Sequence, residues 1–177
     1  MSICKILQAE CSGVYVLKLI GEVRLNLCST IDAAIEEMTN DPDFATIVVD
    51  LSETTLLDST TLGLLVKLGL KAKQKSHFLP SIISTNPDIT RIILTMGFDS
   101  VYLIVKEPAS NNSELTELVS KDIDEDELRA KVLNSHKVLI ELNDHNREQF
   151  KDLVGVLEKE VAKSKASQHA PTKAKAG

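Results

Sequence analysis

Short β-rich runs alternate with helical patterns between residues 3 and 105, and this alternation constrains the fold more than any other feature. The order predicts an α/β fold in which helices cross over between strands of one sheet. The first two runs are separated only by Cys11, Ser12 and Gly13, which predicts an antiparallel hairpin. Each later strand is reached through a helix, which predicts parallel pairs with right-handed crossovers. The sequence therefore predicts a mixed sheet with crossover helices.

Hydrophobic patterns and helix signals place the ends of these elements. Asn86 and Pro87 form a cap followed by proline, a typical helix start, and Gly97 marks the end of the same helix. The expected strands span residues 4–8, 14–20, 46–51, 79–83 and 101–105, and the expected helices span residues 29–38, 59–74 and 87–96. Together they form a domain over residues 1–106.

Composition narrows the class of protein. The chain has 177 residues, 43% of them hydrophobic, which suits one core with an appendage. A net charge of -6 leaves no broad basic surface, so protein partners are expected and direct nucleic-acid binding is not. The longest apolar stretch, residues 62–70, is interrupted by Lys67 and falls far below the roughly 20 residues of a membrane span. With no signal peptide before Glu10, we expect a cytoplasmic protein.

The second part of the chain has a different composition. Residues 107–121 form an expected linker, residues 122–165 a charged helical extension, and residues 166–177 a tail that is expected to be disordered. Acidic residues at the start of the extension and lysines at its end complement a helix dipole. Val132, Leu139 and Leu153 share a heptad row, which His136, Asn143 and Asn146 interrupt. The extension is therefore expected to be a long helix that bends, a helical hairpin, or a helix with buried amides.

The segment 58–63, with the sequence DSTTLG, lies where an expected strand leads into a helix. Sites form at this edge of open α/β sheets. Backbone N–H groups at the helix start can stabilise a phosphate on Ser59, and Asp58 can orient the hydroxyl. The alternative interpretation is that Asp58 or Ser59 is only the helix cap.

The helix that follows this segment is apolar on nearly all sides, with Leu62, Leu65 and Val66 among its residues. One face can pack on the sheet, and the other needs a second cover. That cover is either a protein partner bound around Ser59 or the helical extension of the same chain.

These motifs resemble the STAS family, and in particular its stand-alone bacterial members, the anti-sigma factor antagonists. The likeness spans about residues 3–105 and rests on the segments 19–23 (LIGEV), 47–52 (IVVDLS), 57–60 (LDST) and 62–63 (LG). It implies that Ser59 is phosphorylated by an anti-sigma factor or related serine kinase and dephosphorylated by a PP2C-type phosphatase. It further implies that the unphosphorylated protein captures the anti-sigma factor and frees the sigma factor.

Two residues depart from the family pattern. Thr61 stands where glycine is usual, and it adds a second hydroxyl beside Thr60. Arg24 stands where an acidic residue is common, so it is predicted either to pair with Asp58 or a phosphate on Ser59, or to lie exposed in a loop. The expected environment of the phosphorylation site is Asp58, Thr60, Thr61, Leu62, Gly63, Arg24, Leu65 and Val66.

The helical extension carries a resemblance of its own. The segments 132–137 and 142–146 resemble the tail of a subgroup that is linked to two-component control of motility and biofilm. A flagellar anti-sigma factor is the partner that this resemblance implies. The apolar seam of the extension also allows self-association.

Sequence motifs of catalysis and of cofactor binding are absent. There is no P-loop, GxGxxG or HExxH motif, and no GxSxG around Ser59, so no enzyme activity is expected. Cys4, Cys11 and Cys28 form no CxxC pair and are expected to be reduced, buried thiols rather than metal ligands. Two alternatives stay open: a phosphotransfer module that uses His136 on an exposed helix, and a non-enzymatic scaffold or ligand-sensing STAS module.

Overall fold

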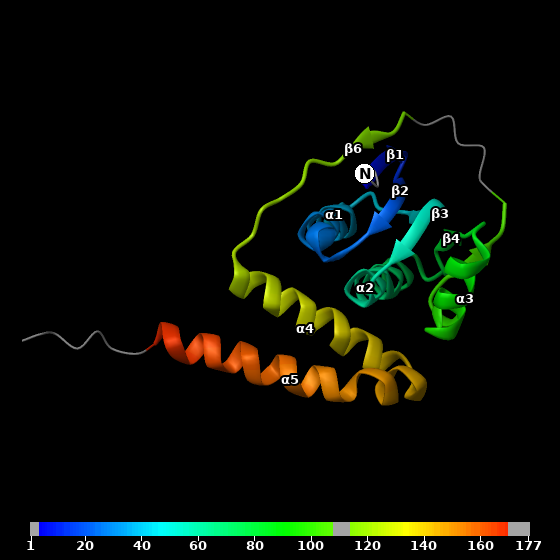
Figure 1. Ribbon diagram of the computed structural model, residues 1–177. Helices are drawn as coiled ribbons and strands as arrows, with labels where there is room; N and C mark the ends of the chain where they lie inside the picture. The colour runs from blue at the N-terminus through cyan, green and yellow to red at the C-terminus, as the bar shows by residue number, and fades with distance from the viewer. Residues whose placement is uncertain (1–3, 108–113, 170–177) are drawn as a thin grey trace, which may run out of the picture.

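One six-stranded mixed sheet forms the centre of the molecule (Figure 1). The computed structural model describes residues 4–107 and 114–169. The sheet has the order β5-β4-β3-β2-β1-β6. Its strands are β1 (Lys5–Cys11), β2 (Val14–Val23), β3 (Thr46–Leu57), β4 (Ser81–Ile83), β5 (Leu103–Val105) and β6 (Thr116–Glu117). The helices are α1 (Cys28–Asn40), α2 (Ser59–Ser76), α3 (Pro87–Thr95), α4 (Glu125–Leu142) and α5 (Asp144–Gln168), with short 3-10 turns at Leu25–Leu27 and Phe98–Ser100.

Strand directions confirm the predicted mixed sheet. β1 and β2 form the antiparallel hairpin, and β2, β3, β4 and β5 are parallel neighbours. The hairpin turn needs Ser12 and Gly13 at positive φ, and a Cβ on Gly13 would lie 2.1 Å from the carbonyl oxygen of Asp43. Glycine at that position lets the turn pass close to the start of β3.

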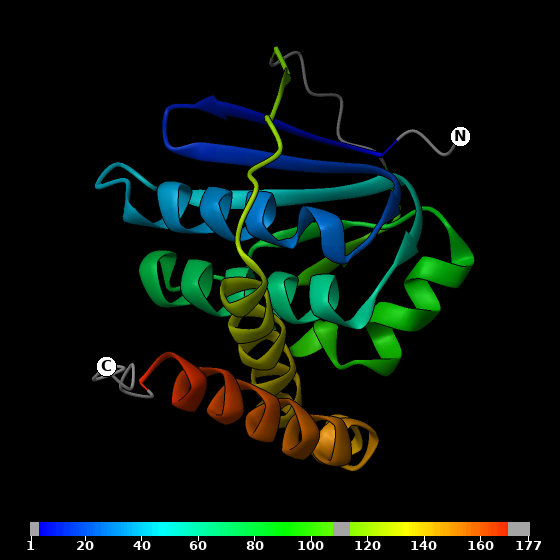
Figure 2. The same ribbon diagram turned by 60° about the vertical axis from the view of Figure 1, so that its left-hand side comes forward.

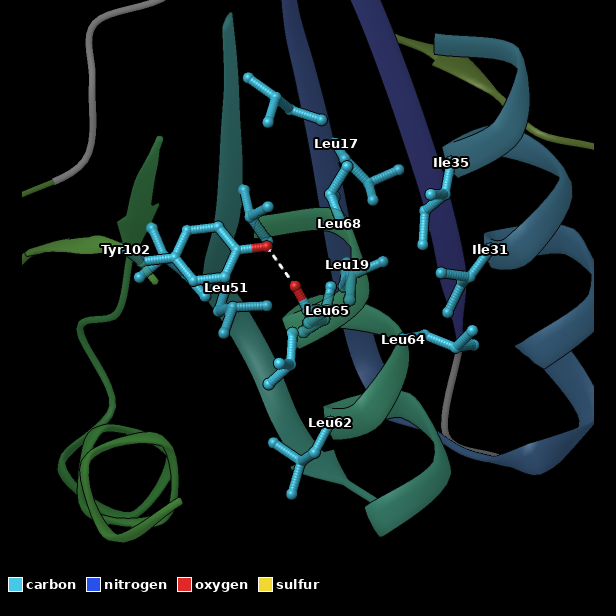
Figure 3. Close-up of a cluster of buried hydrophobic side chains, with 14 of the residues drawn as sticks. Leu17, Leu19, Ile31, Ile35, Leu51, Leu62, Leu64, Leu65, Leu68 and Tyr102 are labelled. Carbon is cyan, nitrogen blue, oxygen red and sulfur yellow. Dashed lines mark hydrogen bonds between the residues drawn. The ribbon is translucent and has the colours of Figure 1, made fainter. Parts of the chain in front are cut away.

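The apolar core lies between the sheet and the pair α1 and α2, which lie on the same side of it (Figure 1). Figure 3 shows leucines of β2 and α2 and isoleucines of α1 pointing into one cluster. The Tyr102 hydroxyl, buried at the edge of that cluster, donates a hydrogen bond of 2.5 Å to the carbonyl oxygen of Leu65. This bond fixes α2 against the segment that leads into β5.

Strand β3 is six residues longer than the sequence predicts, because it continues to Leu57 instead of ending at Leu51. Two register shifts in the β2–β3 pair allow both strands to run on together. The Thr54 hydroxyl donates to the carbonyl oxygen of Leu19 at 2.7 Å. The polar residues that lead into α2 are therefore strand, and α2 begins only one residue after the sheet.

The expected linker contains a strand that the sequence did not predict. β6 pairs antiparallel with β1, and Leu118 N–H donates to the carbonyl oxygen of Ile6 at 2.9 Å. Further along, the Ser29 hydroxyl donates to the carbonyl oxygen of Lys121 at 2.6 Å, and Lys121 N–H donates to the Thr30 hydroxyl at 3.1 Å. The chain is thus attached to the sheet and then to α1 before α4 begins.

The helical extension is a hairpin, one of the three predicted alternatives. Asn143 separates α4 from α5, and its side chain accepts a hydrogen bond from Asn146 N–H as the cap of α5. Figure 2 shows α4 crossing α2 and α5 returning beside α4. α5 continues to Gln168, three residues past the expected end, and the rest of the expected disordered tail, from residue 170, lies outside the described residues.

Candidate functional site

Ser59 is the first residue of α2, directly after the edge of the sheet. Asp58 is the helix cap, because its carboxylate accepts a hydrogen bond of 2.8 Å from Thr61 N–H. Asp58 N–H in turn donates to the carbonyl oxygen of Val23 at 3.2 Å, which ties the cap to the end of β2. The cap interpretation is therefore correct for Asp58, and it leaves the Ser59 hydroxyl free of any capping role.

The Ser59 hydroxyl contacts a histidine 77 positions away in the sequence, at 2.9 Å from Ser59 Oγ to His136 Nε2. The other ring nitrogen of His136, Nδ1, lies 2.8 Å from the carbonyl oxygen of Val132. A carbonyl oxygen can only accept, so in the neutral ring Nδ1–H donates to Val132 and Nε2 accepts the hydrogen of Ser59. This hydrogen bond therefore joins α4 to the unmodified hydroxyl of Ser59.

His136 is buried, with 2% of its surface exposed. The ring of Phe150 from α5 meets it edge to face at a centroid distance of 5.6 Å. The expectation that His136 lies on an exposed helix is therefore wrong, because both ring nitrogens are engaged and the ring is covered. The seam of the hairpin buries it instead.

The face of α2 that follows Ser59 is covered by α4. A Cβ on Gly63 would lie 2.2 Å from the carbonyl oxygen of Ser135, so the backbone of α4 passes directly over this glycine. Leu64 and Lys67 line the same side of α2, beside Lys131 and Ser135 of α4. No local sequence pattern places Leu64, Lys67 or Ser135 at this site, because their role depends on a contact between distant segments.

The predicted docking residues Leu62, Leu65 and Val66 are all buried, so they form no exposed patch. Leu65 belongs to the core beneath α2, where its carbonyl accepts from Tyr102. Of the two covers that the sequence allowed for α2, the helical extension is the one present.

Asp32 of α1 joins three helices through two lysines. Its carboxylate lies 2.7 Å from Lys67 Nζ on α2 and 2.6 Å from Lys131 Nζ on α4. Burial acts to raise the pKa of Asp32, but hydrogen bonds from Lys131 and Lys67 outweigh it and hold the pKa below its ordinary value. This charged cluster fixes the middle of α4 over α2.

The far end of the hairpin docks on the loop after α3. Asn143 Nδ2 and Asn146 Nδ2 donate to the carbonyl oxygen of Met96 at 3.2 and 2.9 Å. Gly97 follows at φ 84°, and a Cβ there would lie 2.4 Å from Asn143 Nδ2. Asn143 and Asn146, two of the three polar residues that interrupt the heptad row, are therefore contacts of the hairpin turn.

The predicted pair between Arg24 and Asp58 does not form. Arg24 instead donates to Glu22 at 3.0 Å, with its side chain 57% exposed, which matches the alternative of an exposed arginine. Thr60 and Thr61 are buried, and Thr61 Oγ1 has no hydrogen-bond partner among the described residues. Ser59, which is only half-buried, is the most accessible hydroxyl of the three.

Other expected features have mixed outcomes. The three cysteines are free thiols, but Cys11 is exposed, so the prediction that all three are buried is wrong. Among residues 4–107 and 114–169, no group of three His, Cys, Asp or Glu side chains could hold a metal ion. None of the helices in that part of the chain is long and apolar enough to cross a membrane.

Solved structures with a similar fold include two forms of one protein. The structure of the anti-sigma factor antagonist SpoIIAA in its unphosphorylated form has a TM-score of 0.50 and 15% sequence identity, and the match covers 59% of this chain and 90% of that one. The structure of the Bacillus cell fate determinant SpoIIAA in the phosphorylated form has a TM-score of 0.48 and 15% identity, covering 59% and 93%. At this identity the likeness concerns the fold, and it leaves a large part of the present chain unmatched.

A family model identifies the first domain. No curated protein sequence matches the chain significantly. The family model described as Mlab, STAS domain, matches residues 8–106, which is more than half of the 177 residues and includes Ser59 but not the α4–α5 hairpin. The predicted resemblance is thus confirmed, and the chain belongs to the STAS domain family.

Proposed function

We propose that this protein is an anti-sigma factor antagonist that switches partners through phosphorylation of Ser59. The observation that carries the proposal is the position of Ser59, half-buried at the first turn of α2 in a STAS domain. Asp58 caps the helix, so the Ser59 hydroxyl is not needed as the cap. The similar fold of a protein described as an anti-sigma factor antagonist supports the class of partner.

Phosphorylation of Ser59 changes the charge of the site. It adds about 1.5 to 2 negative charges at pH 7 next to the Asp58 carboxylate. Backbone N–H groups and the positive end of the α2 dipole stabilise that charge on the protein. A partner that binds the neutral hydroxyl surface meets like-charge repulsion and a desolvation cost, so it leaves.

The partners follow from this switch. A cytoplasmic anti-sigma factor binds the unphosphorylated protein and releases its sigma factor. A serine kinase, either the anti-sigma factor itself or a related protein, modifies Ser59, and a PP2C-type phosphatase restores it. The resemblance of the extension to proteins of motility and biofilm control makes a flagellar anti-sigma factor the first to test.

The test is a pull-down from the native cell with two full-length baits, Ser59→Ala and Ser59→Asp, read by mass spectrometry. We expect the Ser59→Ala bait to retain an anti-sigma factor at least tenfold better than the Ser59→Asp bait. Ser167→Ala and Ser167→Asp on the exposed end of α5 are the matched controls and should behave alike. Equal recovery of the factor by both Ser59 variants would contradict the switch.

Mapping of the phosphorylated residue separates this site from its neighbours. Thr60 and Thr61 adjoin Ser59, so fragmentation of the peptide must place the phosphate on one of the three hydroxyls. Because both threonines are buried, we expect the phosphate on Ser59.

The contact between Ser59 and His136 also has the geometry of a nucleophile and its base, which favours hydrolysis as a second candidate function. His136 lacks the carboxylate that usually orients a catalytic histidine, since Nδ1 binds a backbone carbonyl. Turnover of p-nitrophenyl acetate that is lost in both Ser59→Ala and His136→Gln would favour the hydrolase, whereas we expect no such activity.

A further inference from the structure

The site around Ser59 is covered by a segment of the same chain. α4 lies on the outer side of α2, so that α2 is sandwiched between the sheet and the hairpin (Figure 1, Figure 2). Three contacts span this interface: Ser59 with His136, Gly63 with Ser135, and the lysine pair on Asp32. The cover reaches the residue that the proposed switch modifies.

Two glycines admit the hairpin, one under the middle part of α4 and one at the hairpin turn. Gly63 admits the backbone of α4 at Ser135, and Gly97 admits the Asn143 side chain at the hairpin turn. A side chain at either position would collide with the docked hairpin at 2.2 or 2.4 Å. All three of the nearest atoms around a Cβ at Gly63 belong to Ser135, so this glycine serves the docking of α4 and not the packing of the sheet.

The seat is also less well satisfied than a permanent core. Ser135 Oγ and Asn146 Oδ1, both on the hairpin, are buried and have no hydrogen-bond partner in the described part of the chain. Each such group costs roughly 1 to 3 kcal/mol relative to its hydrated state. Release of the hairpin returns Ser135 and Asn146 to water, so it recovers part of the free energy that undocking loses.

We propose that the outer face of α2, defined by Ser59, Gly63, Leu64 and Lys67, is a helix-docking surface, and that α4 is its resident intramolecular ligand. An external partner binds this face by replacing α4 with a helix of its own. The shape of the seat specifies that helix: it carries a small residue over Gly63 and a hydrogen-bond acceptor opposite the Ser59 hydroxyl. The identity of the partner rests on the proposed function, whereas the docking equilibrium of the hairpin does not.

The test measures opening of the hairpin in the full-length protein. Ser135 is 3% exposed, so Ser135→Cys places a thiol in the buried interface. Serine and cysteine have similar shapes, so the change of volume is small. Pulse labelling with N-ethylmaleimide, followed by peptide mass spectrometry, gives a rate for each thiol separately. Cys11 is an exposed reference and Cys28, in the core of the STAS domain, reports unfolding of that domain.

Two glycine variants are compared in the Ser135→Cys background. Gly63→Ala collides with α4, whereas Gly155→Ala, on α5, has nothing within 4 Å of the added methyl group. Both changes raise intrinsic helix propensity, so they differ only in the collision. We expect Gly63→Ala to accelerate labelling at position 135 at least tenfold, towards the rate of Cys11, and Gly155→Ala to leave it unchanged. Cys28 should stay protected in both.

Equal labelling rates at position 135 in the two glycine variants would overturn the proposal. If Cys28 also becomes reactive in Gly63→Ala, Asn146→Ala replaces it, since that change loosens the hairpin from its far end and leaves α2 intact. Absence of acceleration by Asn146→Ala, with Cys28 protected, would overturn the proposal as well.

A second arm concerns the partner. In the pull-down described above, Asn146→Ala should raise recovery of the anti-sigma factor several-fold over the unmodified chain, and unchanged recovery would refute competition for α2. If labelling shows opening but neither bait retains an anti-sigma factor, the proposed function fails while the docking equilibrium stands.

Discussion

Helix α2 is buried on two sides that differ in chemistry. The inner side packs leucines such as Leu65 and Leu68 against strands β2 and β3, with no exposed surface (Figure 3). The outer side meets α4 through a serine, a histidine and a pair of lysines on one carboxylate, together with apolar residues of α4 such as the buried Leu139. Apolar burial is non-directional and large, whereas polar contacts exchange with water at small net gain. The comparison teaches that one helix can be held by apolar burial on one side and by a mixture of polar and apolar contacts on the other.

Substitutions on the inner side of α2 should reduce the free energy of unfolding most. Leu65→Ala removes a fully buried side chain, and large-to-small changes of this kind cost about 2 to 5 kcal/mol of unfolding free energy. Leu70→Ala on the same helix, where the side chain is 44% exposed, is the control and should cost well under half as much. Urea denaturation followed by circular dichroism measures both. Similar losses in the two variants would show that the inner side is not the structural one.

The charged cluster of the outer side should have an intermediate effect. Asp32→Asn removes the carboxylate that Lys67 and Lys131 share, but each lysine keeps a second carboxylate, Glu36 or Glu127. The lysine side chains are also 29% and 21% exposed, so solvent screens the loss. We expect a cost of about 1 to 2 kcal/mol, below the range for fully buried pairs. Hydrogen exchange should rise in α4 and not in β2 or β3. Asp88→Asn, in an exposed pair with Arg91, is the control and should change neither the free energy of unfolding nor the hydrogen exchange of α4.

The same cluster predicts a pH dependence with a defined sign. The pKa of Asp32 is lowered in the folded protein, so the unfolded state binds the proton more readily. The stabilisation is therefore complete above the ordinary carboxylate value of about 4 and is lost as the pH falls through the lowered value. Protection of α4 should decline below about pH 4 in the unmodified chain. Asp32→Asn should remove that part of the decline, and an identical pH profile would contradict the role of Asp32.

The smallest effect is expected at the contact between Ser59 and His136. A single hydrogen bond contributes about 0.5 to 1.5 kcal/mol, so Ser59→Ala and His136→Gln should each loosen α4 slightly. A double-mutant cycle isolates the pair: the two changes together should cost less than the sum of the single changes by about 0.5 to 1.5 kcal/mol. Labelling of the Ser135→Cys thiol measures the opening free energy in each variant. If the costs of the two single changes simply add in the double variant, Ser59 and His136 do not interact.

Much of the α/β domain could be predicted from the sequence because its signals are local. The hairpin turn at Ser12 and Gly13, the helix start at Asn86 and the strand-to-helix step at Ser59 each depend on neighbouring residues. Strand β6 was missed because two residues carry no periodicity, and the end of β3 was missed because register shifts in its partner strand extend it.

The candidate site was predicted only in part, because its second half comes from distant residues. Ser59 and Asp58 were found from the strand-to-helix motif, but the contact of Gly63 with Ser135 joins residues that no local pattern connects. His136 was recognised as a residue that interrupts the apolar seam, and that interruption was the only available signal of its contact with Ser59. The family pattern allows Arg24 either a pair at the site or an exposed position in a loop, and the carboxylate of Glu22, two residues away, holds it in the exposed position.

The segment from β6 to Lys121, here called the strap, tethers the hairpin and so sets the effective concentration of α4 at the outer face of α2. Lys121 is bonded to Ser29 and Thr30 of α1, and α4 begins at Glu125, so only a few residues separate this anchor from the helix. A ligand on such a short tether acts at an effective concentration of about a millimolar or more even when it is undocked. A partner at cellular concentration must therefore bind α2 much more tightly than α4 does, which makes the threshold for switching a property of the strap as well as of the seat.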